Sequence, residues 1–215
     1  MSKSFTITRA QYREARRAVA DGIRRAGESL SAMIGRAMKM GSPSLKIVPL
    51  REVPGLAGGP ESPVAAAYLG VSGDVVAHMI LCFDLASAHK LAGFLLEKDP
   101  GDLNGLEFDP MSRSALSETG NVTCSSLLNA LSDHSGLVIR PSIPIFVVDM
   151  AGAILSAVLA ELGLAGDEAM VIETAFNVTG EAVNGYLFLL PSPQALETII
   201  SHLGDRSSWP TELSR

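Results

Sequence analysis

The chain carries one hairpin pattern in each of its two halves, and this repeat constrains the fold more than any other feature. Residues 68–83 read Y-L-G-V-S-G-D-V-V-A-H-M-I-L-C-F, and residues 175–190 read A-F-N-V-T-G-E-A-V-N-G-Y-L-F-L-L, so that Gly73 matches Gly180. In both stretches two apolar runs flank a short turn segment that contains glycine, which is typical of a β-hairpin. The chain is therefore built from two copies of one unit.

Both copies show the order helix, strand, hairpin, helix. We therefore predict an α+β fold in which the two copies, related by a pseudo-two-fold axis, build one shared and mostly antiparallel sheet. The predicted domain spans residues 1–204, with repeat one at about 8–98 and repeat two at about 106–203. Residues 205–215 are predicted to form a tail.

Local signals set the expected element boundaries. Thr8 and Gln11 form a capping-box pattern, which predicts a helix over residues 9–39. Asp84 is placed to cap a helix that follows the first hairpin. The other predicted elements are strands at 45–53, 64–71, 75–83, 137–146, 170–178 and 183–190, a loop at 54–63, and helices at 85–97, 110–134, 149–164 and 193–203.

The predicted helix at 149–164 has no counterpart in the first half of the sequence. We interpret it as a helix on which a partner docks, because an inserted element that is apolar on one side needs something to cover that side. The apolar side consists of Ala151, Leu155, Val158, Leu159 and Leu162. The alternative is that these residues belong to the core.

Composition excludes several classes of protein. The 215 residues are 47% hydrophobic and 19% charged, with a net charge of −6 and no basic patch in the sequence, so nucleic acid is not an expected partner. The N-terminus lacks the apolar segment of a signal peptide, and the longest apolar run, residues 150–160, is too short to cross a bilayer. Cys82 and Cys124 make no disulfide framework. We predict a soluble, cytoplasmic protein without membrane insertion.

The predicted helix at 110–134 has an unusual outer face. Asp109 and Pro110 suit its first turn, and Gly136 suits its end. On a helical wheel the residues of the packing arc are Leu116, Gly120, Cys124, Leu127, Leu128 and Leu131. The opposite arc is small and polar, with Ser114, Glu118, Asn121, Ser125, Asn129 and Ser132. An acid beside an amide among serines indicates a surface on which a partner docks.

The spacing Ser114-x3-Glu118-x2-Asn121-x22-Pro144 resembles the motif of the CheC, CheX and FliY phosphatases of bacterial chemotaxis. The segments I-P-I-F-V-V-D-M-A-G-A-I-L and E-A-M-V-I-E-T-A-F, which follow at residues 143–155 and 168–176, look CheC-like as well. The full spacing and its flanks are more specific than the bare Glu-x2-Asn.

The resemblance implies a fold in which two long helices lie side by side on one face of the sheet. It also implies dephosphorylation of a CheY-type response regulator, with Asn121 orienting the attacking water and Glu118 pairing with a regulator lysine. Mg²⁺ is expected on the phosphorylated regulator, and the chain is expected to carry no metal or cofactor of its own. Ser114 and Ser125 are predicted partner-binding residues that keep the face small.

Two-site members of the family carry Glu-x2-Asn on both long helices, so the first helix was compared with the second in two alignments. Matching Gly27 with Ser125 places Ala20 and Ile23 at the positions of the acid and the amide. Matching Pro54 with Pro144 instead places Glu28 and Ser31 there. Neither alignment supplies an asparagine, which predicts a single site.

Two other interpretations stay open. Glu118 and Asn121 are ordinary solvated helix residues if the motif match is accidental. Alternatively, the chain is a docking module of the same fold that binds CheD, a flagellar-switch protein or a regulator without turnover. In CheC proteins the region that begins at Asp149 is associated with CheD binding, so Asp149 is a further predicted partner-binding residue. The intact pair of acid and amide favours the enzyme.

Overall fold

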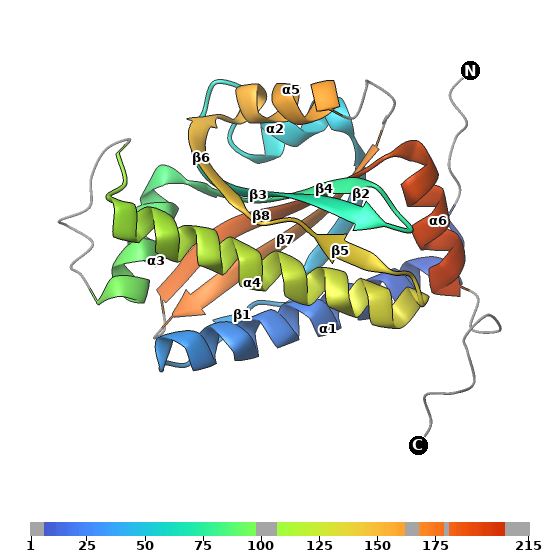
Figure 1. The fold of residues 1–215 in the computed structure, drawn as a ribbon, viewed down its shortest axis with the longest axis horizontal. Coiled ribbons are helices and arrows are strands. Elements are labelled where there is room, and N and C mark those ends of the chain that lie inside the picture. The colour runs from blue at the N-terminus through green and yellow to red at the C-terminus, as the bar shows by residue number, and fades with distance from the viewer. Residues whose placement is uncertain (1–6, 98–106, 162–167, 179–180, 205–215) are drawn as a thin grey trace.

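The computed structural model describes residues 7–97, 107–161, 168–178 and 181–204 (Figure 1). The first half contains helix α1 (Arg9–Ile34), strands β1 (Met38–Met40) and β2 (Ser44–Pro49), the 3-10 turn η1 (Leu50–Glu52), helix α2 (Val53–Leu56), strands β3 (Pro63–Gly73) and β4 (Ala77–Asp84), and helix α3 (Leu85–Leu96). The second half contains helix α4 (Pro110–Ser135), strands β5 (Ile139–Pro141) and β6 (Ile145–Met150), helix α5 (Ala151–Glu161), strands β7 (Glu168–Val178) and β8 (Glu181–Pro191), and helix α6 (Pro193–Gly204). The predicted tail at 205–215 lies outside the described residues.

The described strands form one antiparallel sheet. Its order is β1-β7-β8-β4-β3-β5, with β2 also paired to β7 and β6 also paired to β3. The hairpin β3–β4 and the hairpin β7–β8 meet at the centre through the pairing of β4 with β8. The prediction of one shared, antiparallel sheet is confirmed.

The two halves exchange their first strands. Strands β1 and β2 pair with β7 of the second half, and β5 and β6 pair with β3 of the first half. This pattern is unchanged when the halves are interchanged, so an approximate two-fold axis passes between β4 and β8. The predicted pseudo-two-fold arrangement is therefore confirmed.

Helices cover both faces of the sheet. On one face, α1, α3, α4 and α6 bury the larger apolar cluster, and on the other face α2 and α5 bury a smaller one. The long helices α1 and α4 lie side by side (Figure 1). They approach closely at Gly22, where an added Cβ would lie 2.7 Å from the Cα of Leu127. The side-by-side arrangement that the resemblance implied is confirmed.

The helix starts that the sequence predicted are present. Thr8 and Gln11 form the capping box of α1, and Asp84 caps α3 through the backbone N–H of Ser87. Asp109 accepts a hydrogen bond from the backbone N–H of Ser112 at 2.8 Å and caps α4. These caps need only neighbouring residues, which is why the sequence alone shows them.

Three first-half predictions were wrong. The helix expected to reach residue 39 ends at Ile34, because Gly35 adopts a left-handed conformation with φ of 66°. The residues after it form β1, whose pairing to β7 no local pattern reveals. The expected strand at 45–53 ends at Pro49, and part of the expected loop at 54–63 is helix α2.

The second half needs three corrections. The single strand expected at 137–146 is divided into β5 and β6 by the segment 142–144. Asp149 does not begin a helix but lies in β6, paired with Val64, and α5 begins at Ala151. Nor is α5 without a counterpart, since α2 occupies the equivalent place in the first half and contacts α5.

Candidate functional site

Helix α4 presents the predicted polar face to solvent. Its predicted packing residues Leu116, Gly120, Cys124, Leu127, Leu128 and Leu131 are all buried. On the opposite side, Ser114, Glu118 and Asn129 are exposed, and Asn121, Ser125 and Ser132 are half-buried. The periodicity of the sequence therefore located both faces of the helix correctly.

Glu118, Asn121 and Ser125 form one hydrogen-bonded row along this face. The Nδ2 of Asn121 donates to Oε2 of Glu118 at 3.4 Å, and the Oγ of Ser125 donates to Oδ1 of Asn121 at 3.5 Å. Both contacts are long, and the amide keeps a second N–H and a second lone pair. Within the described part of the chain Glu118 forms no ion pair. The face can thus offer a donor, an acceptor and a carboxylate to a partner.

Gly120 sets the height of this row above the sheet. A Cβ added at Gly120 would overlap the Cβ of Ala67 in β3 and would lie 3.6 Å from its Cα. The helix can pack this close to the strand because neither Gly120 nor Ala67 has a larger side chain. Asn121 follows directly in the chain, so its position depends on this contact.

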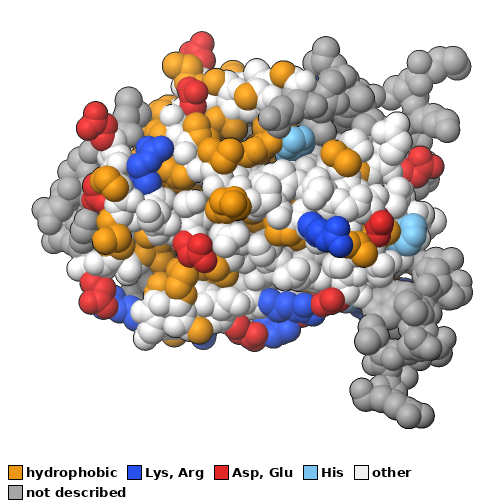
Figure 2. All heavy atoms as spheres, in the orientation of Figure 1, with side chains coloured by type: hydrophobic (Ala, Val, Ile, Leu, Met, Phe, Trp, Pro, Cys, Tyr) orange, Lys and Arg blue, Asp and Glu red, His pale blue; other side chains and the backbone are white. Residues whose placement is uncertain are grey.

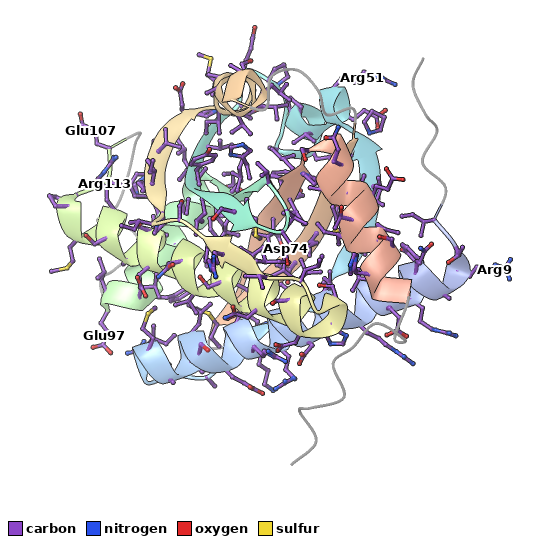
Figure 3. The ribbon with its side chains drawn as sticks, turned by 45° about the vertical axis from the view of Figure 1, so that its right-hand side comes forward. Arg9, Arg51, Asp74, Glu97, Glu107 and Arg113 are labelled. Carbon is purple, nitrogen blue, oxygen red and sulfur yellow. The ribbon has the colours of Figure 1, made fainter. Side chains whose placement is uncertain are left out.

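Within the described residues, neither Asp149 nor Ser114 forms a hydrogen bond with the row of Glu118, Asn121 and Ser125. Asp149 is exposed in β6 and lines a shallow hollow with Arg113, Glu107 and Phe108. Figure 3 shows Arg113 and Glu107 at the N-terminal end of α4. The guanidinium of Arg113 donates to the carbonyl of Phe146 at 3.3 Å and lies 5.1 Å from the ring centroid. Sequence reasoning missed Arg113, because its partner lies 33 residues away.

The apolar side of α5 belongs to the core. Ala151, Leu155 and Val158 are buried, and Leu159 packs against the same cluster. Leu162 lies outside the described residues. The interpretation of this side as a docking face is therefore wrong for the four described residues. The part of the region that is open to solvent is a hollow between β6 and α5, lined by Asp149 together with Ile145, Ala153 and Ala157.

The structure corrects the alignment between the two halves. The long helix and the first two strands of each half begin 101 residues apart, at 9 and 110, at 38 and 139, and at 44 and 145. This alignment matches Arg17 with Glu118, Ala20 with Asn121, and Pro43 with Pro144, where each second residue belongs to the second half.

Both alignments tried from the sequence were therefore wrong. Their shared result, that the first helix lacks the asparagine, still holds. Arg13 and Arg24 stand where the second half has Ser114 and Ser125, so the α1 face is basic where the α4 face is small and polar. Arg9 and Arg16 are exposed on the same helix, and sequence analysis found no such local basic surface.

The remaining reactive side chains are placed for packing. Burial raises the pKa of the Cys82 thiol to about 12 and raises the pKa of Cys124 as well, so both stay protonated. His78 and His89 are buried as well. Nδ1 of His78 lies 2.5 Å from the hydroxyl of Tyr68, and the ring of His89 stacks on that of Phe108.

Figure 2 shows the face of the molecule that carries α4. Hydrophobic side chains gather over β6 and α5, whereas charged side chains are scattered along α1 and α4. Within the ranges that the structure describes, no helix has the length and apolar character needed to cross a membrane.

Comparisons with known proteins show which family this chain resembles. The model of the CheC-like family matches residues 111–148. The chain is 33% identical over 184 residues to the CheY-P phosphatase CheC of Bacillus subtilis (strain 168), covering 83% of this chain and 88% of that protein.

Several solved structures are similar in fold, and two of them overlap with this chain as follows. FliY of Thermotoga maritima matches with a TM-score of 0.71 at 14% identity, covering 93% of this chain and 98% of FliY. A chain of the CheX-CheY-BeF3-Mg²⁺ complex from Borrelia burgdorferi matches with a TM-score of 0.50 at 16% identity, covering 81% of this chain and 97% of that chain.

Proposed function

The chain belongs to the CheC-like family, and from this premise we propose that it is a phosphatase that dephosphorylates a CheY-type response regulator. The observation that supports this most directly is the exposed row of Glu118 and Asn121 on α4, with the acid and the amide in contact at 3.4 Å. Their spacing, the serines beside them and Pro144 reproduce the motif whose resemblance pointed to the same activity.

Hydrolysis of an aspartyl phosphate needs little chemistry from the phosphatase. In a regulator that carries Mg²⁺ at the phosphorylated aspartate, the missing component is a water held in line with the breaking P–O bond. Fixing that water removes much of the entropic barrier. This chain then supplies positioning groups and no metal of its own.

Asn121 is suited to hold the water. Its Oδ1 accepts a hydrogen bond from the water, and an amide carries no charge that would repel the phosphoryl group. The contacts with Glu118 and Ser125 restrain the amide from both sides along the helix. Gly120 holds the helix at one height above β3, so the water would be presented at a fixed distance from the sheet.

Glu118 is suited to bind the regulator. It is exposed and unpaired within the described residues, so it can form an ion pair with a lysine when the regulator docks. Ser114 and Ser125 flank the row with small side chains, which leaves room for the partner to approach α4 closely.

A second function is supported by one separate observation. The hollow between β6 and α5, which Asp149 lines, lies away from the polar face of α4 and is open to solvent. A module that only docks CheD or a flagellar-switch partner would use such a surface. CheD binding at Asp149 stays a prediction.

The deciding experiment follows the decay of a purified, phosphorylated cognate regulator with and without this protein. Asn121→Ala is expected to slow the accelerated decay at least about 100-fold, equivalent to about 2.7 kcal/mol of barrier, while the fold survives. Asn184→Ala, which changes an exposed asparagine in β8, is the control and should change nothing. If wild-type protein binds the regulator without accelerating decay, the docking function replaces the enzymatic one.

A further inference from the structure

The segment between β5 and β6 exposes a large apolar side chain. Ile143 is 86% exposed, more than any other large hydrophobic residue in the described ranges. An isolated exposed isoleucine needs no explanation by itself. The loop that carries it is also held in place by hydrogen bonds and prolines, and an exposed apolar side chain on a held loop is a candidate contact for a partner.

Hydrogen bonds and prolines hold this loop against β3. The backbone N–H of Ser142 donates to the carbonyl of Gly70 at 2.8 Å, and the N–H of Gly70 donates back to Oγ of Ser142 at 3.0 Å. Pro141 and Pro144 fix φ on either side of the segment. Because the backbone is already ordered, a partner that covers Ile143 loses little conformational entropy in the loop.

The loop also lies beside the candidate site. Both β5 and β6 contact α4, and the segment joining them runs along the middle of that helix (Figure 1). The first half shows the same relationship in detail, since Ser42, the counterpart of Ile143, lines one hollow with Ala20, the counterpart of Asn121. The approximate two-fold axis therefore predicts that Ile143 and Asn121 border a common surface.

The two halves differ at this loop in the same way as they differ at the motif. The first half has arginine and alanine in place of the acid and the amide, and it has Ser42 in the loop. The second half has the acid, the amide and Ile143. The apolar side chain thus accompanies the intact motif and is absent from the half without it.

We propose that Ile143 is an apolar anchor that binds the phosphorylated regulator next to Glu118 and Asn121. This inference rests on the proposed function and adds the part of the interface that supplies affinity. Exposed aliphatic side chains on rigid supports gain free energy when a partner removes them from water. The row on α4 would then orient the attacking water, whereas Ile143 would contribute to binding of the regulator.

The test compares regulator binding and turnover among variants of the full chain. Ile143→Ser gives this loop the first-half residue, and it should raise Kd and KM for the phosphorylated regulator roughly tenfold while kcat stays unchanged. Ser42→Ile, the reciprocal change, should alter neither value in the wild-type background. Val76→Ser removes another exposed apolar side chain, 57% exposed, and should also have no effect.

The outcomes separate the two proposals. Equal Kd values for wild type and Ile143→Ser, at equal urea midpoints, would overturn the anchor and leave the phosphatase untouched. Wild-type protein that binds but does not accelerate decay would overturn the phosphatase, and the Kd comparison would still decide the role of Ile143. A loss of kcat without a change in KM would also contradict an anchor, because it would place the side chain in the chemical step.

Discussion

Gly120 of α4 rests directly on Ala67 of β3, so closely that a methyl group on the glycine would overlap the alanine side chain. The contact joins the middle of the helix that carries the candidate site to the middle of β3. It connects packing to function, because the next residue in the chain is Asn121. The height of the amide above the sheet is set by the absence of one methyl group.

Gly120→Ala is therefore predicted to destabilise the protein by about 1–3 kcal/mol, the usual cost of overpacking a core contact. The shift of α4 should also lower turnover, although no catalytic group is removed. Urea unfolding at equilibrium measures the first effect, and regulator decay measures the second.

A compensating change provides the control for this prediction. Ala67→Gly in the same chain removes the opposing methyl group, so the double variant should recover part of both losses despite the weakness of glycine in a strand. If the losses of unfolding free energy in the two single variants simply add in the double variant, the contact does not restrain the helix.

Glu118→Gln is predicted to raise KM and to lower turnover, because it removes an ion pair formed on docking while keeping an acceptor for Asn121. The wild-type KM should rise with salt, and the KM of the variant should rise less steeply. Steady-state kinetics at two ionic strengths provide the measurement. Glu61→Gln, an exposed acid in a turn of the other half, is the control, and an identical effect of both changes would refute a local role.

The first helix should accept a transplanted site. In an Asn121→Ala background, acceleration of regulator decay is predicted to return when four α1 residues are given their α4 counterparts, namely Arg13→Ser, Arg17→Glu, Ala20→Asn and Arg24→Ser. The reason is that α1 and α4 share length, caps and buried positions.

The same four-residue variant separates charge from catalysis. Restoring Ala20 while keeping the three other changes should abolish the regained rate, and adding Ser42→Ile should lower KM further. A folded four-residue variant that binds the regulator but gains no activity would show that α1 no longer provides the required geometry.

Acid should weaken the ion pairs that Asp21 forms within α1. Burial of Asp21 raises its pKa, but hydrogen bonds from Arg24 and Arg25 outweigh this and hold the pKa below its ordinary value of 3.8. Arg25 also pairs with Asp133 of α4 at 2.6 Å. A carboxyl with a lowered folded pKa stabilises the fold above 3.8, and this contribution is lost as pH falls through the lowered value.

Urea unfolding at pH 7 and near pH 3 checks this sign. Wild type should lose more stability between the two values than Asp21→Asn, by up to about 1 kcal/mol, since the ion pairs are partly exposed. Glu61→Gln should follow wild type. A larger acid-induced loss in Asp21→Asn than in wild type would reverse the assignment.

Much of the fold could be read from local patterns. The capping signals at Thr8, Asp84 and Asp109, the hairpins and the two faces of α4 depend on residues within a few positions of each other, and all are present. The candidate row of Glu118 and Asn121 was predicted for the same reason, since both lie on one helix face at a spacing of three residues.

The errors share a different cause. β1 exists because β7 supplies its partner, and Asp149 lies in a strand because it pairs with Val64. The apolar side of α5 is core because the far face of the sheet lies beneath it. Each of these features depends on residues that are distant in the chain. Local periodicity and secondary-structure propensity therefore do not predict them.

The sequence by itself determined which elements this protein contains: a duplicated unit, its helices and hairpins, and an acid-amide pair on one helix. Only the tertiary structure decided how the halves correspond, because the exchange of edge strands sets the 101-residue alignment that pairs Arg17 with Glu118. It also decided that the loop between β5 and β6, to which Ile143 belongs, lies beside α4. Local side-chain patterns report interactions within one or two helical turns. Strand pairing and the packing of a helix on the sheet depend on segments that are far apart in the sequence and meet only in the folded chain.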